Sequence, residues 1–398
     1  MKLIDKTIGR VFEEQVALHS DEDFLIYADR GLRFTFRAFN DRVNRLAKGF
    51  LAIGIRKGDH VGLWATNVPD WLTVFFATAK IGAVLITVNT AYRLHELEYL
   101  IEQSDITTLC LIDGYRDSNY VSMVNELIPE LKTAQRGKLS SARYPCLKNL
   151  VFIGPEKHRG MFNTQELLLL GSQVEDAELD RIKNSLNCQE VVNMQYTSGT
   201  TGFPKGVMLT HHNILNNGFT IGENLKLTHA DRLCLCVPLF HCFGLVLCMM
   251  SVITHGASVV AVEQFDPLLV LASVQQEKCT VLCGVPTMFT ALIDHPETPR
   301  HDLRTLKFCG SGGAPLPVEV AQRYQEVAGV PVSEGWGMTE TSPTGTFTPL
   351  DGGKAGSCGI PLPRVTLRIL SLEDPTKYVA PDEKGEMCIE GPNVMKGY

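Results

Sequence analysis

The segment from residue 196 to residue 207 carries the residue types with which proteins bind phosphate. It reads Tyr-Thr-Ser-Gly-Thr-Thr-Gly-Phe-Pro-Lys-Gly-Val, so four hydroxyl side chains alternate with two glycines ahead of a lysine. Glycine lets backbone N–H groups turn toward a ligand, hydroxyls and successive amides form an anion-binding concavity, and a lysine adds a mobile positive charge. The segment predicts a polyphosphate-binding loop made by Thr197, Ser198, Gly199, Thr200, Thr201, Gly202 and Lys205.

The spacing within this loop differs from that of the P-loop NTPases. Their pattern places glycine and lysine five and six positions after the first glycine, followed by serine or threonine. Counted from Gly199, this chain supplies Pro, Lys and Gly at 204–206, so an ordinary ATPase or GTPase is not indicated. A flexible polar surface loop is the plain alternative. The strand-like residues at 191–196 and 207–209 favour instead a ligand loop held between two strands.

Four further motifs follow the loop. The chain reads Pro-Leu-Phe-His-Cys-Phe-Gly at 238–244, Gly-Ser-Gly-Gly-Ala-Pro-Leu at 310–316, Glu-Gly-Trp-Gly-Met-Thr-Glu-Thr at 334–341, and Gly-Glu-Met-Cys-Ile-Glu-Gly-Pro-Asn-Val-Met-Lys-Gly-Tyr at 385–398. In this order, the five motifs resemble those of the adenylate-forming enzymes, which include acyl-CoA synthetases, luciferase-like enzymes and peptide-synthetase adenylation domains. The resemblance covers nearly the whole chain. Within the family, the sequence is most similar to medium- or long-chain fatty acid–CoA ligases.

The resemblance implies the layered α/β large domain of the adenylate-forming fold. Residues 1–398 are then expected to form the AMP-binding N-terminal domain, with 350–398 as its partial β-rich subdomain. In the family, an aspartate that binds the ribose, a hinge, and a small C-terminal lid domain bearing a lysine come at later positions. We therefore expect the lid domain to be absent from this sequence and the activity of the isolated chain to be impaired.

The same resemblance implies a reaction. A fatty acid is activated with ATP to acyl-AMP, and the acyl group is then transferred to coenzyme A, so the expected small-molecule partners are a fatty acid, ATP, Mg²⁺ and coenzyme A. Two alternatives remain open: an adenylating ligase for an aryl or luciferin-like acid, and a non-catalytic remnant that binds nucleotide and acyl groups.

Catalytic roles are implied for four side chains. Lys205 would hold the β- and γ-phosphates, and Thr339 would donate a hydroxyl to a phosphate oxygen. Glu340 would bind Mg²⁺ together with Thr197, because Mg²⁺ prefers oxygen ligands; a surface carboxylate is the alternative for Glu340. His241 is expected at the mouth of the acyl pocket. For this lone histidine in an apolar run, a hydrogen-bonded core residue is the alternative.

The resemblance also implies the walls of the binding site. Trp336 would stack on adenine, with Gly335 and Gly337 removing side chains that block its approach; a core tryptophan is the alternative. The apolar residues at 285–289 and the run after Phe243 suit an alkyl chain. The opposite, backbone-lined wall of the adenine pocket would be formed by Gly312, Gly313 and Ala314.

Composition excludes several other classes. The 398 residues carry a formal net charge of −7, which argues against a nucleic-acid surface. The twelve cysteines are scattered, without zinc-site spacing or a secreted disulfide framework. The start of the chain lacks the apolar core of a signal peptide. We expect a cytoplasmic protein with reduced, mostly buried thiols. The sequence leaves the oligomeric state open, with a homo-oligomer among the alternatives.

The elements that must position these residues alternate along the chain. Apolar residues recur at helical spacing from residue 36, and helices are also predicted over 69–80 and 94–103. Buried strands are predicted between them, at 61–65, 84–88 and 107–112. This rhythm is typical of parallel α/β sheets.

Two later segments complete the expected elements. The apolar run at 233–253 contains a proline, a histidine and a glycine in its middle, so it predicts a buried strand, a turn bearing His241 and a core helix; a membrane span is the less favoured alternative. Past residue 350, the segments 365–370 and 386–390 read as strands.

Overall fold

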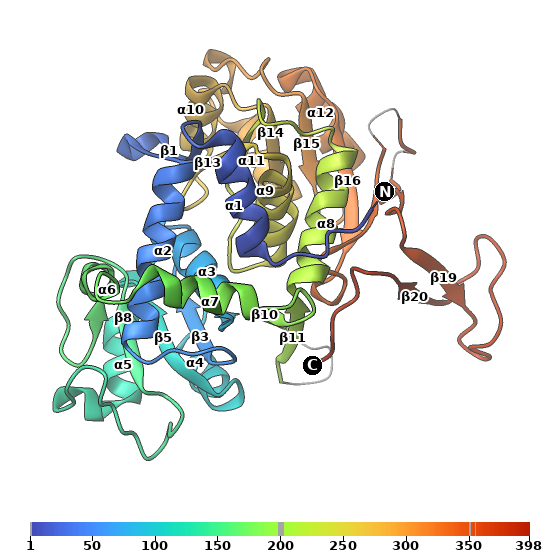
Figure 1. Ribbon diagram of the computed structural model, residues 1–398. Coiled ribbons are helices and arrows are strands. Elements are labelled where there is room, and N and C mark those ends of the chain that lie inside the picture. Colours follow the sequence, from blue (N-terminus) through green and yellow to red (C-terminus); the bar gives the residue numbers. More distant parts are fainter. Residues whose placement is uncertain (1, 198–202, 350–351, 355) are drawn as a thin grey trace.

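The computed structural model describes residues 2–197, 203–349, 352–354 and 356–398. Two large β-sheets, with helices packed between and around them, form the body of the molecule (Figure 1). The layered α/β organisation predicted from the alternating pattern is thereby confirmed.

The first sheet has seven strands among the described residues. Its order is β11-β10-β4-β3-β5-β8-β9, and every neighbouring pair is parallel except β10 and β11. The strands at 61–65, 84–88 and 107–112 are found within one residue of their predicted ends. The bounds are β3 His60–Trp64, β4 Val84–Thr87, β5 Ile106–Leu111, β8 Asn149–Phe152, β9 Phe162–Asn163, β10 Val191–Thr197 and β11 Lys205–Thr210.

The second sheet has nine described strands in the order β18-β17-β16-β15-β14-β12-β13-β1-β2. Its central strands are parallel, and antiparallel pairs close both edges. The bounds are β1 Asp23–Tyr27, β2 Leu32–Thr35, β12 Arg232–Leu235, β13 Ser258–Ala261, β14 Val281–Gly284, β15 Phe308–Ser311, β16 Val332–Gly337, β17 Thr344–Phe347 and β18 Ile360–Pro361.

The helices begin at residues suited to that position. The Thr35 side chain accepts a hydrogen bond from Ala38 N at the start of α2, and proline opens α3, α10 and α11. The helices predicted from residue 36 onward, over 69–80 and over 94–103 correspond to α2, α3 and α4. The bounds are α1 Ile8–His19, α2 Phe36–Ala52, α3 Pro69–Ile81, α4 Leu94–Gln103, α5 Tyr120–Leu127, α6 Thr164–Gly171, α7 Asp176–Ser185, α8 His211–Asn224, α9 Ser251–His255, α10 Pro267–Glu277, α11 Pro286–Asp294 and α12 Val318–Ala328.

One continuous apolar core joins both sheets. It includes buried residues of α2, α3 and α8, such as Phe50, Phe75 and Ile214, together with strand residues from each sheet. The apolar run at 233–253 is part of this core and forms β12, the turn with His241, a π-helix at Phe243–Met250 and α9. In the portion of the chain that the structure describes, every helix is too short or too polar to cross a bilayer.

The C-terminal part is an antiparallel ribbon. Strands β19 (Thr366–Leu370) and β20 (Glu386–Glu390) pair along their whole length and project from the body, as Figure 1 shows at the right. The chain then returns to the first sheet, where Met208 N donates to Gly397 O at 2.9 Å and Lys396 N donates to Met208 O at 3.0 Å. The two predicted strands at 365–370 and 386–390 are confirmed. That 350–398 forms a subdomain stays a prediction.

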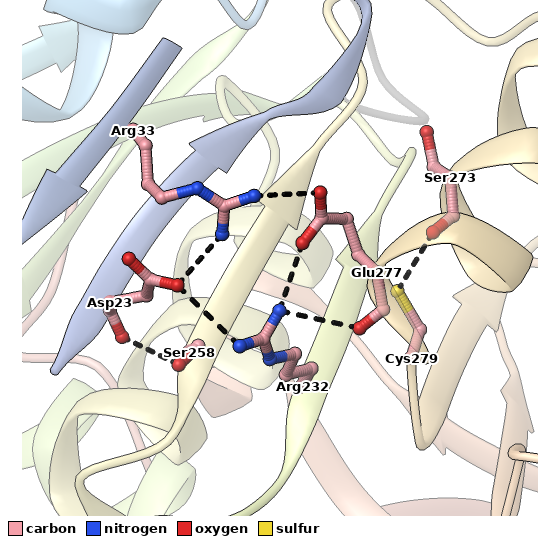
Figure 2. Close-up of polar contacts among 7 residues, drawn as sticks. All are labelled: Asp23, Arg33, Arg232, Ser258, Ser273, Glu277 and Cys279. Atoms are coloured by element: carbon pink, nitrogen blue, oxygen red, sulfur yellow. Dashed lines mark hydrogen bonds and ion pairs between the residues drawn. The ribbon is translucent and has the colours of Figure 1, made fainter. Parts of the chain in front are cut away.

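A ring of alternating charges joins four elements at one end of the second sheet (Figure 2). Arg33 on β2 donates to Asp23 at 2.7 Å and to Glu277 at 2.8 Å, while Arg232 on β12 lies 2.9 Å from Glu277 and 3.5 Å from Asp23. Ser258 Oγ donates to the Asp23 carbonyl at 2.6 Å. Each charge has two opposite neighbours, so the ring fixes β1, β2, β12 and the end of α10 relative to one another.

The cysteines are all free, and eight of the twelve are buried. Burial raises the pKa of Cys236 and that of Cys242 to about 12, so both remain protonated thiols near neutral pH. The expectation of mostly buried, unpaired thiols is confirmed.

Candidate active site

A cavity of about 410 Å³ lies where strands of both sheets end. Thr197 is the last residue of β10, Ser311 the last of β15, and Gly337 the last of β16, and all three line the cavity. Ligands of α/β proteins usually bind at such carboxyl ends of strands. The predicted site residues that share this cavity are Thr197, Lys205, His241, Gly312, Gly313, Gly335, Trp336, Gly337, Thr339 and Glu340.

Other predicted residues are not found on this wall. Ser198, Gly199, Thr200, Thr201 and Gly202 lie outside the described residues. Ala314 is exposed and lies one position beyond the wall that ends with Gly313. Thr287 and Met288 border a second cavity of about 640 Å³ with Phe240, and Phe289 is buried in a separate core cluster. That 285–289 contributes to an acyl pocket stays a prediction.

The stem of the predicted phosphate loop is an antiparallel pair of strands. Thr197 on β10 lies opposite Lys205 on β11, so both strands extend further into the motif than its composition indicated. Next to Lys205, the Pro204 carbonyl accepts a hydrogen bond from the Tyr99 hydroxyl at 3.1 Å, and the Tyr99 ring stacks on Phe203 at 5.1 Å. Helix α4 therefore holds the lysine end of the loop in place.

Glu340 and Lys205 meet at a third side chain, Tyr398. The Tyr398 hydroxyl donates to Glu340 Oε1 at 3.0 Å, and Lys205 Nζ lies 5.2 Å from the centre of the Tyr398 ring. The hydrogen bond to the carboxylate raises the pKa of Tyr398. The Glu340 carbonyl accepts from Met395 N at 2.8 Å, which ties this turn to the C-terminal motif. Apart from its place in the last motif, no feature of the sequence indicated the position of Tyr398.

The position of Trp336 depends on neighbouring glycines. At Gly345 on β17, a Cβ would lie 3.2 Å from the indole ring, so the missing side chain lets the indole pack against the strand. At Gly337, a Cβ would overlap the Pro343 carbonyl, so only glycine permits this close approach of backbone. Gly313 has φ of +82°, a conformation that favours glycine.

The His241 ring has a defined neutral form. Its Nδ1 accepts a hydrogen bond from the backbone N–H of Phe243 at 3.1 Å, so in the neutral imidazole Nε2 carries the proton. The residue keeps solvent contact at the cavity, yet protein atoms surround most of the ring, and this desolvation lowers its pKa. His241 is therefore a neutral N–H donor. The alternative is a hydrogen-bonded core residue: the ring is hydrogen-bonded, but the residue is exposed at the cavity and so does not belong to the core.

The rest of the wall combines apolar side chains with one unpaired hydroxyl. Ser311 is buried, and its Oγ has no hydrogen-bond partner among the described residues, which suits a site that receives a polar ligand. Cys242 lies 3.7 Å from Thr339 Oγ1. The apolar side chains are Leu225, Phe243, Leu247, Phe308 and Phe347. Of these, sequence reasoning missed Leu225, Phe308 and Phe347, because each comes from an element outside the five motifs.

Comparison with known proteins gives consistent results. The family model described as "AMP-binding enzyme" matches residues 12–398. The Bacillus subtilis protein named "Putative acyl-CoA synthetase YngI" is 46% identical over 401 residues, which cover 100% of this chain and 73% of that protein. The mitochondrial medium-chain acyl-CoA ligase ACSF2 of Danio rerio is 33% identical over 406 residues, which cover 100% of this chain and 66% of that protein.

Solved structures agree on the fold. The long-chain fatty acid–CoA ligase FadD1 from Archaeoglobus fulgidus superposes with a TM-score of 0.82 at 24% identity, covering 100% of this chain and 77% of that one. The anthranilate–CoA ligase AuaEII, solved with anthranoyl-AMP, gives a TM-score of 0.84 at 23% identity, with 99% and 70% covered. The fold class expected from the sequence is confirmed.

Proposed function

The chain belongs to the AMP-binding enzyme family, and on that basis we propose that it activates a fatty acid with ATP and transfers the acyl group to coenzyme A as an acid–thiol ligase. One observation carries the proposal. Lys205, Glu340 and Trp336 share a single cavity with a wall of large apolar side chains, so polar groups suited to a nucleotide lie beside a surface suited to an alkyl chain.

The first step needs control of negative charge. A fatty acid carboxylate attacks the α-phosphate of ATP and pyrophosphate leaves, so two anions must be brought together and the charge that develops must be stabilised. The Lys205 ammonium, at the end of the loop stem, would bind the β- and γ-phosphates. The Thr197 and Thr339 hydroxyls would donate to phosphate oxygens, and the buried Ser311 hydroxyl is a further donor on the same wall.

The nucleotide base and the acid have separate partners. Trp336, Gly312 and Gly313 line the same cavity, and the two glycines carry no side chain that would fill it, which supports a planar base at this wall. The neutral His241 would donate from Nε2 to the carboxylate or to the acyl phosphate, since its Nδ1 is occupied by a backbone N–H. In the second step, the thiol of coenzyme A attacks the acyl carbonyl and AMP leaves.

The residues present also fit Mg²⁺, the metal implied by the family. Glu340 offers a carboxylate held by Tyr398, and Thr197 and Thr339 offer hydroxyl oxygens on the same cavity. When bound with ATP, Mg²⁺ would neutralise phosphate charge. We further propose a cytoplasmic location, which subcellular fractionation tests.

Exchange of labelled pyrophosphate into ATP tests the adenylation step. We expect exchange by the purified chain with saturated fatty acids, at the impaired rate that the sequence predicts for this chain alone, and a slow thiol-dependent loss of the adenylate when coenzyme A is added. Exchange with aryl acids only would replace the proposal by the aryl-acid alternative. ATP binding without exchange for any acid would favour a non-catalytic remnant.

A further inference from the structure

Two histidines and a glutamate meet on the surface, away from the active-site cavity. His19 ends α1, Glu22 follows three residues later, and His229 lies in the turn before β12. His19 Nδ1 lies 2.9 Å from Glu22 Oε1, and His229 Nδ1 lies 3.4 Å from Glu22 Oε2. The two imidazole rings stack with their centres 5.0 Å apart, and ligand atoms of all three residues lie within 4.8 Å of one another.

The protein frame holds these residues together across about two hundred positions of sequence. Glu22 immediately precedes Asp23, and His229 comes three residues before Arg232, so both flank members of the charge ring in Figure 2. The His19 ring lies against Gly256, where a Cβ would come within 2.8 Å of the imidazole. The cluster is therefore positioned by the protein frame, with Glu22 and His229 about half exposed and His19 only 16% exposed.

Glu22 is the carboxylate of an acidic stretch that faces the two histidines. Asp21, Glu22 and Asp23 are consecutive. Arg37 lies 3.3 Å from Asp21, and the charge ring holds Asp23 between Arg33 and Arg232. Glu22 instead pairs with His19 and His229, so among the described residues its carboxylate is the one of the three that these imidazoles share.

From this arrangement we propose that His19, Glu22 and His229 form a binding site for a zinc-type transition-metal ion, with water as the remaining ligand. Bond lengths of about 2.0–2.1 Å in a tetrahedral site place ligand atoms roughly 3.3 Å apart. The distances of 2.9 and 3.4 Å, which run to different oxygens of Glu22, lie near that value. The ligand atoms as a set lie within 4.8 Å of one another, so small side-chain rotations would bring them onto one ion. Imidazole nitrogen with one carboxylate selects zinc-like ions over Mg²⁺ and Ca²⁺, which prefer oxygen alone.

A metal bound here would join three parts of the molecule. Helix α1, the start of β1 and the turn before β12 would share one ion, so the N-terminal helix would be clamped to the second sheet. The site is independent of the proposed ligase activity, because none of its residues lines the active-site cavity.

Calorimetric titration of the chelator-treated chain with zinc chloride tests the proposal. We expect one strong site in the wild type, at least tenfold weaker binding in both His229→Ala and Glu22→Gln, and a zinc-dependent rise in thermal midpoint that both variants lose. His95→Ala is the matched control, since His95 and Glu98 repeat the His-Glu spacing of three without a second histidine. It should bind zinc as the wild type does.

Cobalt(II) provides a second readout. A nitrogen–oxygen site gives visible d–d bands without an intense thiolate charge-transfer band, and these bands should disappear in His229→Ala. His229 and Glu22 are about half exposed, so without metal both variants should have the circular dichroism spectrum of the metal-free wild type. If one variant fails to fold, the zinc affinity of the other variant tests the proposal. Equal zinc affinity in both folded variants and the wild type, a thiolate spectrum, or the lack of a stoichiometric site would overturn the proposal and leave a His–Glu ion pair.

Discussion

At the scale of single residues, Tyr398 connects the two charged side chains of the cavity. Its hydroxyl donates to Glu340, and its ring faces the Lys205 ammonium. A cation beside an aromatic ring gains about 0.5–1 kcal/mol at an exposed site, less than a charge-assisted hydrogen bond, which contributes roughly 1.5–3 kcal/mol. A phosphate oxygen can therefore compete with this ring for Lys205 at a net gain.

Replacing Lys205 should weaken nucleotide binding. We expect Lys205→Ala to bind Mg-ATP about ten- to a hundredfold more weakly, because a charge-assisted contact of roughly 1.5–3 kcal/mol is lost. Calorimetry measures the change. Lys384→Ala, an exposed lysine between β19 and β20, serves as control. Unchanged affinity in Lys205→Ala would contradict the assignment of the phosphate site.

Leu247 offers a test of the apolar wall. An indole at this position would occupy cavity volume, so we expect Leu247→Trp to raise the KM for long fatty acids more than for short ones, without changing the KM for ATP. Leu169→Trp, at a surface position that is 71% exposed, controls for the substitution itself. An equal effect on all chain lengths would place the acyl chain elsewhere.

At the scale of elements, polar contacts decide how helices and strands are oriented on the apolar core. The charge ring joins β1, β2, β12 and α10, while Lys80 joins α3 to α1 and α2. Apolar packing is tolerant of small shifts, whereas charge pairs and hydrogen bonds have narrow geometry, so these contacts specify one arrangement.

Removing one carboxylate of the charge ring should lower the stability of the protein. Glu277 is 12% exposed and contacts Arg33 and Arg232, so Glu277→Ala leaves two guanidinium groups with one carboxylate between them. We expect a loss of about 1–3 kcal/mol in the free energy of unfolding, since truncating a largely buried pair strands its partner. Urea unfolding measures it. Asp302→Ala, which breaks an exposed pair with Arg304, should leave the midpoint unchanged, and equal effects of both changes would count against the ring.

The buried Lys80 is expected to make the free energy of unfolding depend on pH. Its Nζ is buried and donates to Glu13, Asn40 and Asn44, and burial lowers its pKa from 10.5 to about 8 despite the attraction of Glu13. Between these two values, the unfolded chain holds more protons at Lys80 than the native chain does. The Lys80 contribution to the free energy of unfolding therefore increases as the pH rises from about 8 toward 10.5.

The comparison of wild type with Lys80→Met isolates this contribution. Urea unfolding at several pH values between 7.5 and 9.5 should give a steeper rise of stability with pH in the wild type than in the variant. Parallel pH profiles would show that Lys80 keeps an ordinary pKa. Titrating groups outside the cluster of Lys80, Glu13 and Lys183 are common to both proteins and cancel in the difference, and Glu13 is ionised throughout this pH range.

At the scale of the whole molecule, the active site depends on both sheets. Thr197 and Lys205 come from the first sheet, whereas Ser311, Trp336 and Thr344 come from strands of the second. The shared apolar core fixes the distance between these two groups of side chains. A ligand that spans this cavity would contact both sheets at once, and such a site exists only in the folded chain.

Ligands should accordingly raise the thermal unfolding midpoint. One ligand at a hundred times its Kd stabilises the native state by about 2.7 kcal/mol. We expect Mg-ATP and a fatty acid each to raise the midpoint in differential scanning calorimetry, and small aryl acids and amino acids to do so less. A larger shift with an aryl acid would favour the aryl-acid alternative.

The sequence alone determined the features that are local in the chain. Helical periodicity identified α2, α3 and α4, and the order of the five motifs identified the family and ten of the 23 residues that line the cavity. Motif residues are recognisable because each position has a strict requirement. At Gly313 the backbone adopts a positive φ that favours glycine, and at Lys205 the side chain supplies a positive charge to the cavity. Such requirements restrict residue type wherever the segment is finally placed.

Only the tertiary structure decided which distant segments meet. Residues 285–289 have the composition of an acyl pocket, yet Phe289 is buried elsewhere, while Phe308 and Phe347 line the cavity that holds Trp336 and Glu340. Tyr398 reaches Glu340, and His229 reaches Glu22, across long stretches of chain. The physical reason is that an apolar pattern specifies which face of an element is buried but not its partner, and partners are chosen by the packing of the whole core.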